Sequence, residues 1–304
     1  MAEALPRKFG DYVLERRLGV GGMAETFVAR RATHGAVEQR VCLKRVLPAF
    51  SQDPAFVQQF QREARLAGRL RHSNIVGVID FGSVEGELYM GLELVEGVDL
   101  RALMSSLDAP MDPELAALIT LDLAYALEYA HDNGVVHRDV TPSNVLLSLD
   151  GEVKLADFGV AKALDGATIA TASGFIKGKV PYMAPEQMRG GNVDGRADLF
   201  SVGITLYQML AGRRPFVGSH DVEVMMKVLE GNRPPLEELA PDTPALLLEM
   251  TEKLLELDPE NRHAHAGELP EVLAPFLSDG RLRERLAALV RAAHGDDSEP
   301  ERRD

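Results

Sequence analysis

Apolar and polar residues alternate over the N-terminal part of the chain, and this pattern predicts β-strands. Within 11–20, 25–33 and 38–47, apolar side chains recur at every second position over much of each segment. This period of two directs one face of a strand toward a core. Residues 74–95 add two short segments of the same kind, joined by a glycine-containing turn. The pattern therefore predicts a small β-rich unit.

The helical period appears first at residues 51–70 and dominates after a linker near 95–98. Asp53 is predicted to be an N-cap because Pro54 follows it, at the position where a helix tolerates proline best. Further helices are predicted at 112–134, at 201–211 before Gly212, and at 281–293. The chain therefore predicts a β-rich unit with one main helix, followed by a larger α-rich unit.

Composition narrows the class of protein. The 304 residues include 45% hydrophobic and 26% charged side chains, as in ordinary globular domains. A formal net charge of −14 argues against a sequence-independent grip on nucleic acid or an anionic membrane. The one cysteine, Cys42, favours a reducing compartment. With neither a signal peptide nor an apolar run of about 18 residues, we expect a cytoplasmic chain without a membrane segment.

Three features of the N-terminal unit suggest a phosphate site. Gly19, Gly21 and Gly22 lie between two predicted strands, where glycines let backbone N–H groups approach phosphates closely. Lys44 ends an apolar strand, and a half-buried lysine requires an anion or a carboxylate. Glu63, on the following helix, is the carboxylate expected to pair with it. The alternatives are a simple hairpin turn for the glycines and a surface salt bridge for the lysine.

Three longer motifs follow: HRDVTPSN at 137–144, VKLADFGVAK at 153–162 and GKVPYMAPEQ at 178–187. With the glycine-rich loop, the strand lysine and the helix glutamate, they resemble the motifs of eukaryotic-type protein kinases, and most closely those of bacterial serine/threonine kinases. The resemblance runs from about residue 12 to about residue 262. It implies an α+β, bilobal protein kinase fold with a small β-rich lobe and a larger α-helical lobe.

The resemblance also implies domain boundaries. We expect an N-terminal extension at 1–11, a kinase N-lobe at 12–95, a C-lobe at 96–277, and a C-terminal helix with a charged tail at 278–304. The C-terminal helix either caps the larger lobe or mediates a homodimer, and the sequence leaves both open.

By the same resemblance, each catalytic residue has an implied role. Asp139 orients the attacking hydroxyl and accepts its proton, while Lys44, oriented by Glu63, holds the α- and β-phosphates of ATP. Asn144 and Asp157 hold Mg²⁺, with Mn²⁺ as the alternative, against the triphosphate. The division suits phosphoryl transfer, which requires charge neutralisation and alignment more than covalent help.

The resemblance implies more residues for the nucleotide pocket than for catalysis. Within it the backbone of Glu93 and Val95 is expected to pair with adenine, and Asp99 to reach the ribose. The pocket residues are Leu18, Gly19, Val20, Gly21, Gly22, Met23, Ala24, Thr26, Cys42, Lys44, Leu92, Glu93, Val95, Asp99 and Leu146.

Other matching residues are expected to hold the site in register. Glu186 is predicted to pair with Arg262, and Asp198 to brace the catalytic loop from the next helix. His137 is predicted to pack under Phe158.

Some positions depart from the family pattern. Ala24 stands where a third glycine is usual, which is tolerated if the backbone there does not need a positive φ. Thr26 replaces the usual valine against adenine. Cys42 stands where alanine is common, and it is expected to act as a small buried hydrophobe rather than a reactive thiol.

The most informative departure is Thr141, which stands where serine/threonine kinases carry a lysine that contacts the γ-phosphate. Lys179, in turn, stands where those kinases carry a threonine. We expect that the two residue types have exchanged places and that the ammonium group still reaches the γ-phosphate. The alternative is a solvated Lys179 and crippled catalysis.

A few residues indicate how the enzyme is regulated and which residues it phosphorylates. Arg138 precedes the catalytic aspartate, and such a cation is commonly matched by a phosphate on the activation segment. Thr168, Thr171 and Ser173 are therefore candidate autophosphorylation sites, the last two being favoured. Pro142 is typical of enzymes that phosphorylate serine and threonine in proteins.

The leading hypothesis is thus an active serine/threonine protein kinase. A second is a pseudokinase, a nucleotide-binding scaffold that signals without catalysis, and Thr141 and Ala24 are its support. A third is a small-molecule phosphotransferase of related fold, which the APE segment and the predicted Asp198–Arg262 framework disfavour.

Overall fold

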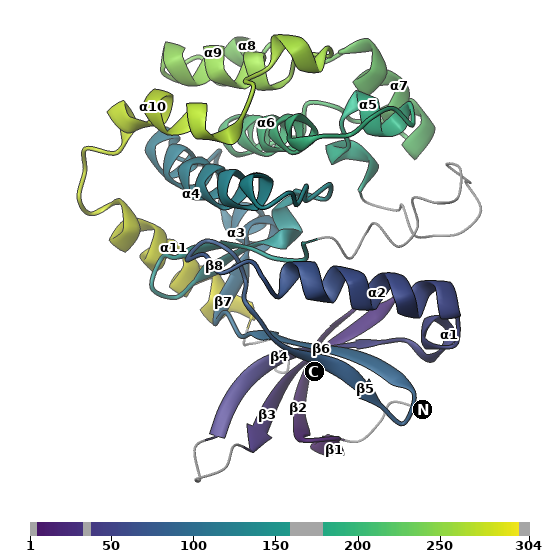
Figure 1. Ribbon diagram of the computed structural model, residues 1–304. Helices are drawn as coiled ribbons and strands as arrows, with labels where there is room; N and C mark the ends of the chain where they lie inside the picture. Colours follow the sequence, from purple (N-terminus) through teal and green to yellow (C-terminus); the bar gives the residue numbers. More distant parts are fainter. Residues whose placement is uncertain (1–4, 33–37, 159–178, 298–304) are drawn as a thin grey trace. The chain divides into compact units, whose positions relative to one another are not determined.

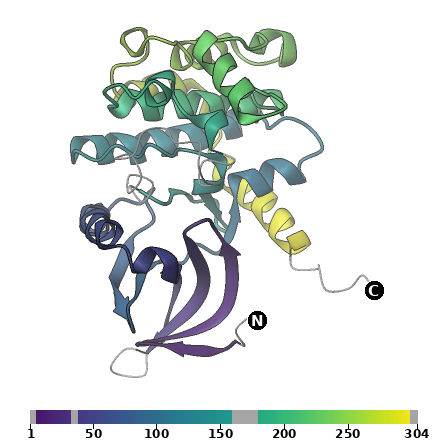
Figure 2. The same ribbon diagram turned by 90° about the vertical axis from the view of Figure 1, so that its right-hand side faces the viewer.

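The structure is a computed structural model that describes residues 5–32, 38–158 and 179–297. These residues divide into two compact units. The first contains the described residues up to His72 together with Val76–Val95, and the second contains Ser73–Ile75 and the described residues from Glu96 onward. Figures 1 and 2 show the elements of both units.

The first unit is built on a six-stranded antiparallel sheet with the order β1-β2-β3-β4-β6-β5. Its strands are β1 (Arg7–Phe9), β2 (Tyr12–Val20), β3 (Ala24–Ala32), β4 (Glu38–Val46), β5 (Val78–Val84) and β6 (Glu87–Glu93). The strands predicted from alternation are confirmed. The sequence pattern did not predict β1, which pairs with β2 and adds an edge strand before the region of kinase resemblance.

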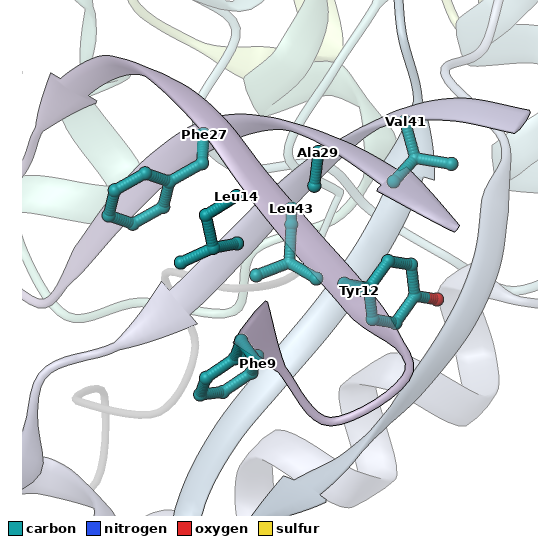
Figure 3. Packing of buried hydrophobic residues seen from close by; sticks show 7 residues of the cluster. All are labelled: Phe9, Tyr12, Leu14, Phe27, Ala29, Val41 and Leu43. Carbon is teal, nitrogen blue, oxygen red and sulfur yellow. The ribbon is translucent and has the colours of Figure 1, made fainter. Parts of the chain in front are cut away.

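One face of this sheet forms the core of the unit, as Figure 3 shows. Since side chains alternate along a strand, the neighbours of the core residues belong to the opposite face. There the register pairs Thr26 with Lys44 and Val28 with Cys42. Thr26, Cys42 and Lys44, three of the residues predicted to meet the nucleotide, thus share the face opposite this cluster. The core residues are Phe9, Tyr12, Leu14, Phe27, Ala29, Val41 and Leu43.

Two helices complete the first unit, α1 (Pro48–Ser51) and α2 (Pro54–Ala67). Asp53 Oδ1 accepts a hydrogen bond from the Ala55 N–H at 2.9 Å, which confirms the predicted N-cap. The helix packs against β5 and buries Phe56 and Phe60. Burial of each of these side chains stabilises the fold by about 2 kcal/mol.

The second unit is mainly helical and also holds a three-stranded antiparallel sheet with the order β7-β8-β9. Its strands are β7 (Gly97–Asp99), β8 (Val145–Ser148) and β9 (Val153–Leu155). Its α-helices are α3 (Leu100–Ser106), α4 (Pro113–Asp132), α5 (Pro185–Met188), α6 (Gly195–Ala211), α7 (Asp221–Glu230), α8 (Leu236–Leu239), α9 (Ala245–Leu254), α10 (Leu269–Leu273) and α11 (Leu282–Asp297). Short 3₁₀ turns are η1 (Pro142–Asn144), η3 (Val180–Tyr182), η4 (Pro259–Asn261), η5 (Ala266–Glu268) and η6 (Ala274–Phe276).

Helix α6 lies at the centre of this unit, between α4 and α9. It ends as predicted at Gly212, which has a φ of 69°. Its predicted start at residue 201 was wrong, because Asp194 accepts the Arg196 N–H at 2.9 Å and caps the helix six residues earlier. Gly203 is needed for the packing, since a Cβ there would lie 2.8 Å from the Leu254 Cβ.

Helix α11, yellow in Figures 1 and 2, packs against β7, β8, α3 and α4. Leu286 and Val290 are fully buried in this contact. The C-terminal helix therefore caps the larger unit, as one of its two predicted roles required. Within the part of the chain that the structure describes, no helix is both long enough and apolar enough to span a membrane.

Candidate active site

The catalytic loop, residues 137–144, connects α4 to β8, and Asp198 of α6 holds its backbone. The carboxylate of Asp198 accepts the backbone N–H of His137 at 2.8 Å and that of Arg138 at 2.6 Å. His131 Nε2 lies 2.8 Å from Asp198 Oδ2. Because the side chain of Asp198 is fully buried, it fixes the loop on the central helix, and the predicted bracing role is confirmed.

Asp139 is the third residue of this loop, and both its backbone carbonyl and its carboxylate accept hydrogen bonds. Asn144 Nδ2 donates to the Asp139 carbonyl at 2.8 Å and to Asp139 Oδ2 at 2.9 Å. Lys179 Nζ donates to the same Oδ2 at 2.8 Å. Asp139 Oδ1 has no hydrogen-bond partner among the residues that the structure describes. One carboxylate oxygen is thus anchored, and the other is available to a ligand hydroxyl.

The structure brings Lys179 to the catalytic loop although the two are 40 positions apart in sequence. Its side chain is 44% exposed, whereas that of Asp139 is 9% exposed. Thr141 is buried, with 8% of its surface exposed. Lys179 therefore forms an ion pair with Asp139, whereas Thr141, on the loop itself, carries a neutral hydroxyl.

The two predicted metal ligands, Asn144 and Asp157, lie close together in the backbone. The Ala156 N–H, one residue before Asp157, donates to the Asn144 carbonyl at 2.8 Å. Asp157 has a φ of 64°, an uncommon conformation outside glycine that is concentrated at functional sites. Since the Asn144 amide nitrogen is used by Asp139, its amide oxygen is the atom that remains for a cation.

This donor set fits a hard cation such as Mg²⁺, which takes oxygen ligands and is commonly bound through one or two carboxylates plus substrate phosphates. Among the described residues, no cluster of three or more histidine, cysteine, aspartate or glutamate side chains could hold a metal alone. A cation at Asn144 and Asp157 would therefore depend on phosphate and water for its other ligands.

The glycine-rich hairpin, which is predicted to cover phosphates, belongs to the first unit. Neither Gly19 nor Gly21 has a positive φ. A Cβ on either would meet its nearest neighbour at 3.5 and 3.4 Å respectively, an ordinary contact. The fold itself therefore does not demand glycine at these two positions, which favours a ligand over a simple turn as their reason. Ala24 lies in β3 opposite Val46 and also lacks a positive φ, so the missing third glycine is tolerated.

The predicted lysine and glutamate of the first unit lie on β4 and α2. Lys44 is partly buried beside Thr26 on the strand face described above. Glu63 is buried, and its Oε1 accepts a hydrogen bond from Gln59 Nε2 at 2.6 Å. The pairing of Lys44 with Glu63 stays a prediction.

The linker residues are placed at the end of β6 and in β7. The Glu93 N–H donates to the Gly77 carbonyl at 2.8 Å, and the contact of the Glu93 backbone with adenine stays a prediction. Val95 follows the strand. Asp99 Oδ1 accepts the Ala102 N–H at 2.7 Å and caps α3, a structural role that the sequence reasoning missed. Its contact with ribose, like the other pocket assignments, stays a prediction.

Residues 12–272 match the family model described as protein kinase domain. The chain belongs to the protein kinase family. It is 40% identical over 288 residues to the tyrosine-protein kinase MasK of Myxococcus xanthus, a match that covers 90% of this chain and 44% of that protein. It is 38% identical over 272 residues to the serine/threonine-protein kinase PknB of Mycobacterium leprae, covering 87% of this chain and 42% of that protein.

The crystal structure of the Mycobacterium tuberculosis PknI kinase domain has the same fold. It is 30% identical to this chain with a TM-score of 0.69, and the match covers 91% of this chain and 100% of that one. The predicted α+β kinase fold, a β-sheet lobe and a helical lobe, is thereby confirmed. The chain spans less than half the length of MasK and PknB.

The framework of the kinase lobe is formed as predicted. Arg262 donates from both terminal nitrogens to the Glu186 carboxylate, at 2.7 and 2.9 Å, and also to the Arg196 carbonyl at 2.9 Å. The rings of His137 and Phe158 pack edge to face, with their centroids 4.5 Å apart. These contacts connect the catalytic loop and the APE segment to the body of the lobe.

Two positioning residues of the kinase were missed by sequence reasoning. His131 binds Asp198 from α4, and Gln187 Nε2 donates to the Arg138 carbonyl at 3.0 Å. Gln187 is the last residue of GKVPYMAPEQ, and His131 lies six positions before HRDVTPSN, so closeness to a motif was the available signal. The predicted phosphorylation sites Thr168, Thr171 and Ser173 lie outside the described residues.

Proposed function

We propose that this chain is the catalytic domain of a serine/threonine protein kinase, which transfers the γ-phosphoryl group of ATP to protein hydroxyls. The observation that carries the proposal is the arrangement of Asp139, with Oδ2 held by Asn144 and Lys179 and Oδ1 left for a hydroxyl. An acceptor fixed in this way suits a reaction that depends on alignment and charge more than on covalent catalysis.

In the proposed step, the oxygen of a serine or threonine side chain forms a bond to the γ-phosphorus. The bond from that phosphorus to the β,γ-bridging oxygen breaks, and ADP leaves with the electron pair. The hydroxyl proton passes to Asp139. Asn144 and Asp157 would hold Mg²⁺, or Mn²⁺ in its place, which neutralises charge on the phosphate oxygens when bound. Lys44, oriented by Glu63, would hold the α- and β-phosphates.

The acceptor residue is inferred from the loop and the relatives. Pro142 follows Thr141 as in serine/threonine kinases, and PknB is named as a serine/threonine kinase. The second candidate is transfer to tyrosine, which the name of MasK favours at 40% identity. Phosphoamino-acid analysis of a phosphorylated peptide library distinguishes them. We expect phosphoserine and phosphothreonine, and phosphotyrosine alone would overturn this specificity.

A pseudokinase scaffold is the remaining alternative, and one assay tests it. Purified chain is incubated with radiolabelled ATP, Mg²⁺ and a generic protein substrate, beside Asp139→Asn. We expect transfer by the wild type and a loss of about 10³-fold or more in the variant, as for other groups that act on the reacting proton. Nucleotide binding without transfer in the wild type would instead support the scaffold.

Autophosphorylation of the activation segment is part of the proposal. Arg138 lies on the catalytic loop with a φ of 66°, and a phosphate on the segment would pair with its charge. Thr171 and Ser173 are the favoured acceptors. Mass spectrometry after incubation with ATP and Mg²⁺ should find phosphate there in the wild type and not in Asp139→Asn. We also propose a cytoplasmic location for this domain, where ATP is supplied.

A further inference from the structure

We propose that Lys179 is a catalytic residue of this kinase: its ammonium group contacts the transferred phosphoryl group from the stretch just before the APE motif. In the kinases that this chain resembles, a lysine at the position of Thr141 does so from the catalytic loop. The inference rests on the proposed phosphoryl transfer and adds the group that stabilises its charge.

The first observation is where the ammonium group lies. Lys179 Nζ is 2.8 Å from Asp139 Oδ2, the oxygen that also accepts from Asn144. A hydroxyl that binds Asp139 Oδ1 would therefore lie within a few ångströms of Lys179 Nζ. The phosphorus that this hydroxyl attacks would lie beside the same cation.

The second observation is that the ammonium group has donors to spare. An ammonium carries three N–H donors, and among the described residues Asp139 is the one side chain that Lys179 binds. The lysine side chain is 44% exposed, whereas that of Asp139 is 9% exposed. Two donors thus remain for phosphate oxygens without any loss of the contact with Asp139.

The third observation is that hydrogen bonds and burial fix the backbone at Lys179 and the residues that follow it. Its carbonyl accepts the Tyr182 N–H at 2.9 Å. The following residues, Val180 and Pro181, are buried in η3. The Tyr182 carbonyl in turn accepts from Ser201 Oγ of α6 at 2.8 Å. The lysine therefore precedes a short turn that is hydrogen-bonded to α6, the central helix of the unit.

Thr141 cannot supply the charge itself. It is 8% exposed, it carries no ionisable group, and its side chain does not cap η1. A surface salt bridge, the simplest alternative for Lys179, contributes little and would leave catalysis unchanged when removed. If Lys179 contacts the phosphoryl group, its removal should instead lower kcat strongly, because each donor directed at developing charge contributes about 10²–10³-fold to kcat.

The test is a reciprocal exchange. We expect Lys179→Thr to lower kcat by about 10²–10³-fold with the KM for a peptide substrate little changed. The double variant Thr141→Lys/Lys179→Thr, which restores the arrangement usual in the family, should recover kcat by at least about tenfold over Lys179→Thr. Lys227→Thr, which removes a partly exposed lysine from a helical ion pair on α7, is the matched control and should keep the wild-type kcat.

A binding measurement separates phosphate contact from mere support of Asp139. Affinities for ADP and for a non-hydrolysable ATP analogue are measured by calorimetry in wild type and Lys179→Thr, with folding checked by thermal denaturation. We expect the variant to bind the analogue about fivefold or more weakly and ADP equally well. A kcat within about threefold of wild type, or an unchanged ratio of analogue to ADP affinity, would overturn the proposal. The binding result stands even if the wild type transfers no phosphate, an outcome that would refute the proposed function alone.

Discussion

The carboxylate of Asp198, on helix α6, accepts the backbone N–H of Arg138 at 2.6 Å. The same carboxylate accepts the N–H of His137 at 2.8 Å. A buried side chain thus determines the path of the backbone one residue before the catalytic aspartate. Correct placement of Asp139 depends on this contact as much as on the residues that touch its own carboxylate.

The contact predicts that Asp198→Ala lowers both stability and activity. Two buried backbone N–H groups would lose their acceptor, which costs about 1–3 kcal/mol each. We expect the free energy of unfolding to fall by about 3 kcal/mol, with phosphotransfer reduced further because Asp139 shifts. Urea denaturation and the kinase assay measure the two effects. Asp194→Ala, which removes the exposed cap of the same helix, should cost about 1 kcal/mol and keep activity; equal losses in both variants would contradict the positioning role.

The docking of α11 predicts a role for Arg283. It donates to both oxygens of the Asp122 carboxylate at 2.8 Å, and Asp122 is only 2% exposed whereas Arg283 is 48% exposed. Arg283→Met would leave a buried carboxylate unpaired. We expect the free energy of unfolding to fall by about 2 kcal/mol, discounted for the exposed side of the pair. Arg281→Ala, two positions earlier and just before the helix, removes a side chain that is 81% exposed. It should have no measurable effect, and a loss of equal size there would argue against a specific contact.

His263 predicts a pH dependence of stability. Burial lowers the pKa of His263 below its ordinary 6.5, although its hydrogen bond with Glu268 partly offsets this. The unfolded chain therefore binds more protons than the folded one between the lowered pKa and 6.5. Stability is fully present above this window and declines as the pH falls through it. Urea denaturation at about pH 7.5 and about pH 5.5 should show a smaller decline for His263→Asn than for wild type; identical declines would refute the assignment.

The glycine-rich hairpin predicts opposite effects for two neighbouring substitutions. Ala24→Gly should lower the free energy of unfolding by about 0.5–1 kcal/mol, because glycine weakens a strand, and should not improve nucleotide affinity. Gly21→Ala should change stability by less than about 0.5 kcal/mol, since its Cβ meets only an ordinary contact, but should weaken ATP binding by crowding the phosphates. Calorimetric titration with ATP measures the affinity, and denaturation measures the stability. An unaltered affinity for ATP in Gly21→Ala would show that Gly21 does not contribute to a phosphate site.

Much of the fold was predictable because its signals are local. Alternation placed β2, β3 and β4 to within a residue or two, and the Asp53 cap placed the start of α2. The start of α6 was not predictable in this way. Its first turn carries Arg196 and Asp198, which interrupt the apolar pattern, and Asp198 is buried only because the catalytic loop supplies its donors.

The motifs in the chain were enough to identify the kinase family and to nominate Asp139, Asn144, Asp157, Lys44 and Glu63, because protein kinases carry those residue types in a fixed order and spacing. The contact between Lys179 and Asp139 was decided by the tertiary structure. An ion pair between residues 40 positions apart depends on how η3 packs against α6. The hydrophobic pattern of a single segment does not predict such packing. The same holds for α11: its amphipathic pattern predicted a helix with a buried face, but only the pairing of Arg283 with Asp122 showed which surface that face covers.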